Sequence, residues 1–181
     1  APIWRLLLSK GVVMNIQGLQ KHTLLDYPGK VACTIFLGGC NLRCPFCHNG
    51  SLVSHVPSTP NFTEDEVLSF LEKRGKILDG VCITGGEPLL QDIKPFLRRI
   101  RKLGMCIKLD HNGTKPQVLA ELIEEGLVDY VAIDIKNSLT KYGETVGVPH
   151  FDITPVLETI QILKNNTIPY EFRTTVVQEL H

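Results

Sequence analysis

Short, nearly continuous apolar segments recur along this chain, and longer amphipathic segments separate them. The apolar segments are residues 31–37, 81–84, 106–109, 130–135 and 170–177, of which the last shows more alternation. Such segments are typical of parallel strands buried on both faces, and alternating strands and helices imply right-handed crossovers. The chain has 181 residues, whereas a closed eight-stranded barrel needs at least about 200. We therefore predict an α/β fold built as an open, partial (β/α) barrel of parallel strands.

The segments between these strands carry helix start and stop signals. Thr63 and Glu66 form a capping-box pattern that predicts the start of a helix. Pro116 and Pro155 stand where two further helices should begin, and Gly104 stands where one should end. The apolar stripes of these helices predict ordinary core packing.

Charge and hydropathy narrow the classes of function. The 19 basic residues balance 19 acidic ones, so no overall basic field attracts nucleic acid or an anionic membrane. The densest basic run, residues 98–102, predicts a solvated helix face. No apolar run approaches the about 18 residues of a membrane span. We expect a cytoplasmic protein without nucleic-acid or membrane partners. Residues 1–13 would be an extension or leader before a natural start at Met14, and residues 14–181 one domain.

Distinctive segments follow four of the predicted strands. A cysteine loop, 40–47, follows the first, and Gly85-Gly86-Glu87-Pro88 follows the second. Residues 110–113 follow the third, and residues 134–136 end the fourth. Function gathers at the carboxyl ends of the strands in such sheets. The common placement of these segments therefore predicts a single active site.

The cysteine loop contains three of the six cysteines, Cys40, Cys44 and Cys47, in a C-x3-C-x2-C pattern. A fully ligated [4Fe–4S] cluster takes four cysteines, so three local thiolates would leave one iron open to a substrate. A zinc site with His48 as fourth ligand is the alternative, although Cys47 and His48 are sequence neighbours and a second C-x2-C knuckle is missing. The remaining cysteines are predicted to be buried apolar side chains. They are Cys33, Cys82 and Cys106.

This cysteine motif, with Phe46 before its last cysteine, resembles the signature of the radical S-adenosylmethionine (SAM) superfamily. The wider segment 18–49, with Asp26-Tyr27-Pro28-Gly29-Lys30 inside it, resembles the activating enzymes of glycyl radical enzymes. Within that branch it is most similar to the anaerobic ribonucleoside-triphosphate reductase activating group. The resemblance covers roughly Met14 to the C-terminus. It implies a [4Fe–4S] cluster and SAM as cofactors, with the cofactors carrying the difficult chemistry.

The implied reaction begins with reductive cleavage of SAM at the cluster. The resulting 5′-deoxyadenosyl radical would abstract a hydrogen atom from a glycine of a partner glycyl radical enzyme. The partner implied is anaerobic ribonucleoside-triphosphate reductase, and the electron donor a flavodoxin or a ferredoxin-type protein. Family members continue past the fifth predicted strand, so the resemblance also implies a barrel that lacks its last strand.

The resemblance also implies roles for individual residues. Cys40, Cys44 and Cys47 would hold the cluster, Phe46 would lie near adenine, and Asp26 would help hold the glycine-bearing loop of the partner. The remaining residues would contact SAM, and one of them, Lys136, would also be a catalytic residue. They are Gly85, Gly86, Glu87, Pro88, Asp110, Asn112, Asp134, Lys136 and Arg173.

Two of these SAM contacts carry a further implication. In the pyruvate formate-lyase branch, the aspartates matching Asp110 and Asp134 help bind a monovalent cation beside the SAM carboxylate. His111 stands where threonine is usual in that element, which puts the cation site in doubt. The alternatives are turn or capping chemistry for Asp26, Asp110 and Asp134, and a structural ion pair for Arg173. An ordinary strand-to-helix turn is the alternative for residues 85–88.

Two other functions stay open. A small-molecule radical SAM enzyme, similar to 7-carboxy-7-deazaguanine synthase, would need a closed apolar pocket with a few polar contacts. An open lateral cleft would favour the activating enzyme instead. An inactive or zinc-bound fragment is the non-enzymatic alternative.

Overall fold

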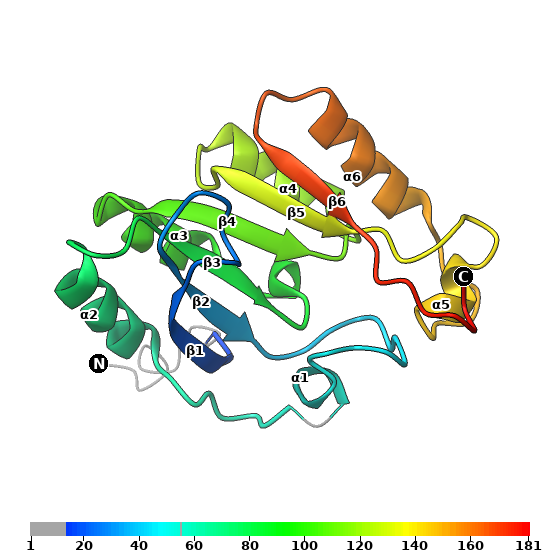
Figure 1. Ribbon diagram of the computed structural model, residues 1–181, viewed down its shortest axis with the longest axis horizontal. Helices are drawn as coiled ribbons and strands as arrows, with labels where there is room; N and C mark the ends of the chain where they lie inside the picture. Colours follow the sequence, from blue (N-terminus) through cyan, green and yellow to red (C-terminus); the bar gives the residue numbers. More distant parts are fainter. Residues whose placement is uncertain (1–13, 55) are drawn as a thin grey trace, which may run out of the picture.

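A computed structural model describes residues 14–54 and 56–181, and the expected extension 1–13 lies outside these described residues. Six strands form one sheet in the order β1-β2-β3-β4-β5-β6, and the sheet is not closed (Figure 1). The strands from β2 to β6 are parallel, while β1 pairs with β2 in the antiparallel direction. Their bounds are β1 Ile16–Thr23, β2 Ala32–Leu37, β3 Gly80–Gly85, β4 Cys106–His111, β5 Tyr130–Asp134 and β6 Tyr170–Arg173. The predicted open, partial barrel of parallel strands is thus confirmed.

Two strand predictions need correction. The sequence analysis missed β1, whose segment Ile16–Thr23 mixes apolar with polar residues and has two register shifts against β2. The last predicted strand, 170–177, ends at Arg173. The residues beyond it are not in the sheet, and the carbonyl oxygen of Leu180 accepts a hydrogen bond from the Asn137 amide at 2.8 Å.

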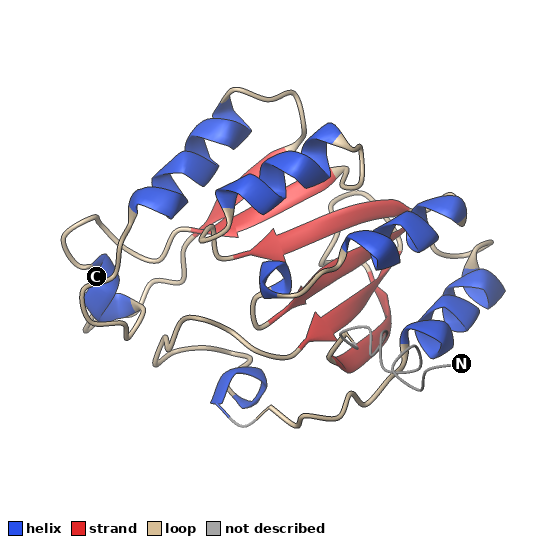
Figure 2. Ribbon diagram, turned by 180° about the vertical axis from the view of Figure 1, so that it is seen from behind, coloured by secondary structure: helices blue, strands red, loops and turns tan. Residues whose placement is uncertain are grey.

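The long helices lie on one face of the sheet (Figure 2). Among the described residues no long helix lies on the opposite face, which is called the uncovered face below (Figure 1). The bounds of the long helices are α2 Glu64–Arg74, α3 Lys94–Lys102, α4 Pro116–Glu124 and α6 Thr154–Lys164. Shorter turns of helix are α1 Ser51–Ser54, η2 Pro88–Leu90 and α5 Tyr142–Thr145. The starts predicted at Thr63, Pro116 and Pro155 are confirmed within one residue. Among the described residues, no helix has the length and apolar character to cross a bilayer.

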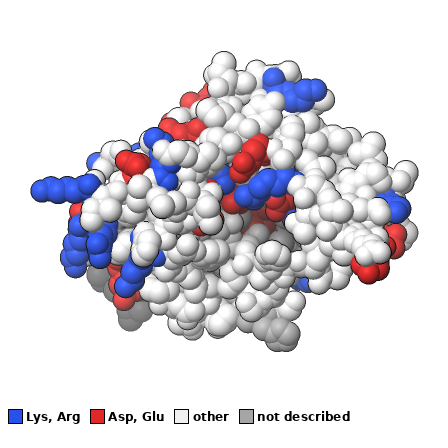
Figure 3. All heavy atoms as spheres, in the orientation of Figure 1, with Lys and Arg blue, Asp and Glu red and all other residues white. Residues whose placement is uncertain are grey.

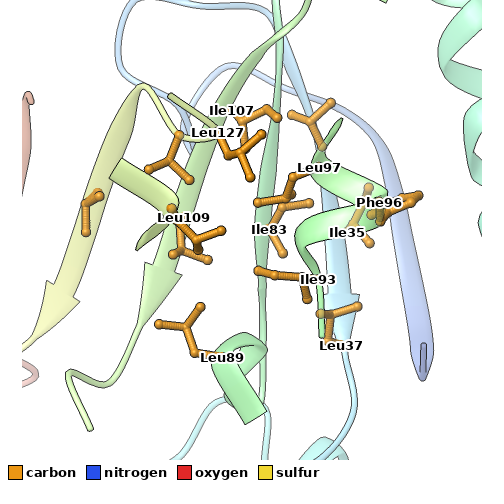
Figure 4. Packing of buried hydrophobic residues seen from close by; sticks show 14 of the residues in the cluster. Ile35, Leu37, Ile83, Leu89, Ile93, Phe96, Leu97, Ile107, Leu109 and Leu127 are labelled. Atoms are coloured by element: carbon orange, nitrogen blue, oxygen red, sulfur yellow. The ribbon is translucent and has the colours of Figure 1, made fainter. Parts of the chain in front are cut away.

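The hydrophobic core lies between the sheet and these helices (Figure 4). Ile107 and Leu109 of β4 point into it, and Phe96 and Leu97 of α3 pack there, all of them buried. The strands are buried on both faces, as predicted: Thr34, Cys82 and Lys108, which face away from the helices, are all buried. That second face includes polar residues as well as apolar ones. Successive side chains of a strand point to opposite faces, so the residue between Ile107 and Leu109, Lys108, lies on the uncovered face. That face is therefore available for polar chemistry.

The basic run on α3 joins neighbouring elements. Arg98 pairs with Glu125 beside α4, and Arg99 pairs with Asp65 of α2. Both arginines are exposed, as predicted for a solvated face, although each has a carboxylate partner. Arg101 is only partly exposed and pairs with Asp129 at 2.8 Å.

Thr63 caps α2 in both directions. Its hydroxyl accepts a hydrogen bond from the backbone N–H of Glu66, whose carboxylate accepts one from the backbone N–H of Thr63 at 2.8 Å. Replacing Thr63 by alanine should lower the free energy of unfolding by about 1 kcal/mol, because the backbone N–H of Glu66 loses its side-chain acceptor and the Glu66 carboxylate loses the Thr63 hydroxyl. Urea denaturation would measure this, with Thr140→Ala, a substitution at an exposed loop threonine, as the control. Equal stability of both variants would contradict the capping role.

Candidate functional site

A cavity of about 300 Å³ lies at the carboxyl ends of the parallel strands. Each of the four segments that the sequence analysis singled out contributes to its wall, together with β6. The predicted site residues that line it are Cys40, Cys44, Phe46, Cys47, Gly85, Gly86, Asp110, Asn112, Asp134, Lys136 and Arg173. Acidic and basic side chains lie together at a hollow on the uncovered face of the molecule (Figure 3). The structure therefore brings the segments into one site.

Three of the predicted site residues do not line this cavity: Asp26, Glu87 and Pro88. The Glu87 carboxylate is fully buried and accepts hydrogen bonds from the backbone N–H groups of Leu89 at 2.9 Å and Asn112 at 2.7 Å. Burial raises the pKa of Glu87 to about 7, and these two N–H groups oppose the shift. Glu87 thus ties the turn after β3 to the turn after β4.

Asp26 lies outside the cavity wall. Its carboxylate accepts a hydrogen bond from the Thr34 hydroxyl of β2 at 2.5 Å. The neighbouring Tyr27 is buried, with its ring centroid 6.0 Å from that of Tyr130, the first residue of β5. The segment between β1 and β2 therefore closes the amino end of the uncovered face.

The sulfur atom of Cys40 already has polar neighbours on the cavity wall. The backbone N–H of Leu42 donates to it at 3.4 Å, and the side-chain amide of Asn112 lies 3.8 Å away. Burial raises the pKa of Cys40, and these hydrogen bonds oppose the shift. Burial also raises the pKa of Cys44, against the nearby charge of Lys136. Metal binding requires deprotonated thiols, and the N–H donors and Lys136 are the neighbours that favour that form.

An iron–sulfur cluster and a zinc ion make different demands on this set of donors. Within residues 14–54 and 56–181, no three His, Cys, Asp or Glu side chains are arranged to hold a single metal ion. The zinc alternative required Cys40, Cys44, Cys47 and His48 to converge on one point. A cubane cluster binds each thiolate at a different iron, so its ligands stay apart. The three thiols lie on the wall of one cavity, as ligands of a single cluster must.

The two glycines after β3 are pressed against the backbone that leads into the cysteine loop. The backbone N–H of Gly86 donates to the Leu37 carbonyl oxygen at 2.8 Å, and that of Glu87 donates to Gly39 at 2.7 Å. A Cβ atom on Gly86 would lie 2.1 Å from the Gly39 carbonyl oxygen. Gly85 has a φ of +120° and equally little space. Close backbone approach therefore requires glycine at both positions.

Replacing Gly86 by alanine should lower the free energy of unfolding by about 1–3 kcal/mol, because the added methyl group displaces the Gly39 backbone. Less iron should bind on anaerobic reconstitution, since Gly39 directly precedes Cys40. Chemical denaturation and iron analysis would measure both effects. Gly75→Ala is the matched control, because its Cβ would meet nothing closer than 3.7 Å and its φ is −57°. The argument fails if the two variants behave alike.

Ion pairs connect the charged residues of the cavity wall. Arg173 contacts Asp110 and Asp134, each at 3.0 Å, and Lys136 contacts Asp134 at 2.9 Å. Burial alone would raise the pKa of Asp134, but Lys136 and Arg173 hold it below its ordinary value. Burial alone would lower the pKa of Arg173, but Asp110 and Asp134 outweigh burial and raise that pKa above its ordinary value. Both aspartates thus have cations of this chain as partners.

The sequence analysis missed Lys108 as a functional candidate. Its side chain is only 2% exposed, and its ammonium group contacts Asp110 at 2.8 Å and Glu171 of β6 at 3.3 Å. The ammonium also lies 5.7 Å from the centre of the Tyr130 ring. The sequence did contain a signal for this role. Lys108 is a lysine inside an apolar strand, and it stands two residues before Asp110, so both side chains lie on the same face of the sheet.

Three further polar residues contact the cysteine loop or line the cavity, and of these the sequence analysis did not single out Asn41. The Asn41 amide accepts a hydrogen bond from Asn112 at 2.8 Å and donates to Thr114 at 2.9 Å. Asn49 donates to the Gly85 carbonyl oxygen at 3.1 Å. His111 lines the cavity, and burial lowers its pKa to about 4. Of the other cysteines, Cys33 and Cys82 are buried as predicted, whereas Cys106 is half-buried.

Comparison with known proteins gives consistent results. Residues 34–179 match the family model described as the Radical SAM superfamily. A Methanocaldococcus jannaschii protein, provisionally described as a glycyl-radical enzyme activating enzyme, is 35% identical over 170 residues that cover 91% of this chain and 69% of that protein. A 7-carboxy-7-deazaguanine synthase of Methanopyrus kandleri is 32% identical over 146 residues that cover 69% of this chain and 55% of that enzyme.

A solved structure is also similar in fold. The structure of the protein anSMEcpe with bound AdoMet superposes with a TM-score of 0.57 over 75% of this chain and 40% of that chain, at 19% identity. The chain spans 69% and 55% of the lengths of the two relatives named above. Those relatives have different activities, so similarity alone does not choose between them.

Proposed function

This chain belongs to the radical SAM superfamily, and from that premise we propose that it is an activating enzyme of a glycyl radical enzyme. The family implies a [4Fe–4S] cluster and SAM, and we assign the cluster to Cys40, Cys44 and Cys47. When bound, the cluster supplies the electron that breaks the bond between the sulfur and C5′ of SAM. The chain's own residues would hold SAM and exclude water.

One observation carries the proposal. The three cysteines, the two glycines after β3 and the charged residues of β4, β5 and β6 line one cavity, and charged side chains surround a hollow on the uncovered face of the sheet (Figure 3). A cavity of this kind admits a protein loop more readily than a sealed apolar pocket would. The relative that covers 91% of this chain supports the same choice.

We assign the SAM contacts by charge. Arg173 and Lys136 would bind the carboxylate of SAM, because both cations lie on the cavity wall. Gly85 and Gly86 would bring backbone carbonyl oxygens close to its amino group, and Phe46 would lie against adenine. A monovalent cation between Asp110 and Asp134 would have to displace Arg173, so we give the neutralising role to Arg173 and Lys136.

The proposed reaction needs one electron from another protein. A flavodoxin or a ferredoxin-type protein would supply it, and cleavage of SAM would give methionine and the 5′-deoxyadenosyl radical. That radical would take a hydrogen atom from the Cα of a glycine in the partner, giving 5′-deoxyadenosine and a glycyl radical. Asp26 would help hold the glycine-bearing loop. Anaerobic ribonucleoside-triphosphate reductase is the partner that we propose.

The second candidate is the formation of 7-carboxy-7-deazaguanine. The similarity to the Methanopyrus kandleri synthase, 32% over 146 residues, favours it. The charged cavity wall weighs against it, because small-molecule sites are mostly apolar with few polar contacts.

Anaerobic reconstitution with iron and sulfide, followed by SAM and dithionite, would test the proposal. With anaerobic ribonucleoside-triphosphate reductase present, we expect 5′-deoxyadenosine and the electron paramagnetic resonance signal of a glycyl radical. Production of 7-carboxy-7-deazaguanine by extracts that contain the chain, and not by extracts of a Cys44→Ala strain, would assign the second candidate instead. Formation of 5′-deoxyadenosine without a glycyl radical would reject this partner.

A further inference from the structure

The segment between β5 and α6 packs against the cysteine loop. The backbone N–H of Arg43 donates a hydrogen bond to the carbonyl oxygen of Val146 at 2.8 Å. The next residue, Gly147, has a φ of +64°, and a Cβ atom on it would lie 2.5 Å from the carbonyl oxygen of Arg43. Two backbones far apart in the sequence are thus in close contact at a position where only glycine fits.

Arg43 in turn holds the first half of the cysteine loop. Its Nη1 donates to the carbonyl oxygens of Cys40 at 2.7 Å and Leu42 at 2.8 Å. Hydrogen bonds from a charged donor are stronger than neutral ones, and the planar guanidinium fixes their direction. Any displacement of Arg43 therefore acts on the backbone between Cys40 and Cys44.

The segment is anchored at the other end to β5. Tyr142 of α5 is buried, stacks on Phe151 with ring centroids 5.4 Å apart, and donates a hydrogen bond to the carbonyl oxygen of Asp134 at 3.4 Å. The Asn137 amide donates to the Thr145 hydroxyl at 2.8 Å. The segment therefore connects the cysteine loop with the strand end that carries Asp134.

We propose that residues 137–151 form a brace that sets the conformation of the cysteine loop, with Arg43 and Gly147 as its positioning residues. The brace fixes the position of the three thiols relative to the charged end of β5 before any cofactor binds. This inference rests on the proposed cluster ligation by Cys40, Cys44 and Cys47. It predicts that a substitution outside the cavity changes cluster retention.

Gly147→Ala tests the brace, with Gly126→Ala as the matched control. Gly126 has a φ of +63°, and no heavy atom lies within 4 Å of its added Cβ. Both variants place alanine in the same left-handed conformation, so the backbone strain is alike. Only the alanine at position 147 displaces Arg43. A chelator should remove iron from the reconstituted Gly147→Ala protein about tenfold faster than from the control, as for residues that orient metal ligands.

A second readout uses the metal-free protein. Limited proteolysis should cut between residues 40 and 47 faster in Gly147→Ala than in Gly126→Ala. If Gly147→Ala does not fold, Arg43→Met replaces it in both assays, because that change removes the two guanidinium hydrogen bonds and keeps the backbone contact. Equal iron loss and equal cleavage in variant and control would overturn the brace. If the wild-type protein binds no iron, the cluster assignment fails, while proteolysis still decides whether the brace exists.

Discussion

Replacing Cys44 by alanine should abolish the formation of 5′-deoxyadenosine from SAM. Cys44 lies on the wall of the same cavity as Cys40 and Cys47. Iron–sulfur clusters are held by cysteine thiolates, and the proposed site already uses one fewer than the usual four. With two thiolates left, the cluster should assemble poorly and should not hold SAM in a reactive position.

The measurement compares iron content and 5′-deoxyadenosine yield after anaerobic reconstitution of wild type and variant. Cys106→Ala is the matched control, because Cys106 is half-buried at the start of β4, away from the cavity wall. The control should retain both iron and SAM cleavage. SAM cleavage by the Cys44→Ala protein would exclude the assigned cluster ligands. Loss of activity in both variants would instead indicate a general loss of structure.

The sheet could be predicted from the sequence where local pattern determines structure. Strands β2 to β5 are short apolar segments with a glycine turn or a helix on either side, and the Thr63 capping box sets a helix start by local hydrogen bonds alone. β1 was missed because an edge strand has one unpaired side and carries exposed polar residues, as Gln20 and Lys21 do. Among the described residues it pairs with β2 and makes one isolated bridge, from Ile16 to Phe62, and both pairings are visible only in the fold.

The candidate site likewise has a part that could be predicted from the sequence and a part that could not. Glycine and cysteine motifs at strand ends could be predicted to meet, because carboxyl ends of parallel strands share one edge. The partners of Arg173 could not be predicted, since Asp110 and Asp134 reach it through two strand pairings. The brace was missed for a similar reason: nothing in the segment 137–151 indicates that it contacts Arg43. Long-range contacts need the fold, even when each residue's chemistry is known.

Replacing Lys108 by methionine should lower the free energy of unfolding by about 3 kcal/mol, the lower end of the cost of breaking a buried ion pair. The ammonium group is the partner of two carboxylates, Asp110 and Glu171. Methionine keeps most of the apolar stem but leaves both carboxylates without this cation. The lower end applies because Arg173 still contacts Asp110 at 3.0 Å and Glu171 at 3.8 Å.

The effect should not depend on pH near neutrality. Burial alone would lower the pKa of Lys108, but the neighbouring Asp110 raises it above its ordinary value overall. The folded state therefore holds this proton more tightly than the unfolded chain does. The stabilisation from the charged Lys108 side chain is fully present below its unfolded-state pKa of about 10.4, and it is lost as the pH rises through its pKa in the folded protein. Urea denaturation at about pH 6, 7.5 and 9 should give the same difference between wild type and variant.

Lys94→Met is the matched control for the buried lysine. Lys94 also faces two carboxylates, Glu121 and Glu125, but this group of charges lies at the surface. Solvent screens such pairs, so the control should lose far less stability than Lys108→Met. Equal losses would mean that burial adds nothing to the pair on the uncovered face. A stable Lys108→Met protein with weakened SAM binding would instead assign Lys108 to orienting Asp110 and Arg173 for the ligand rather than to holding the sheet together.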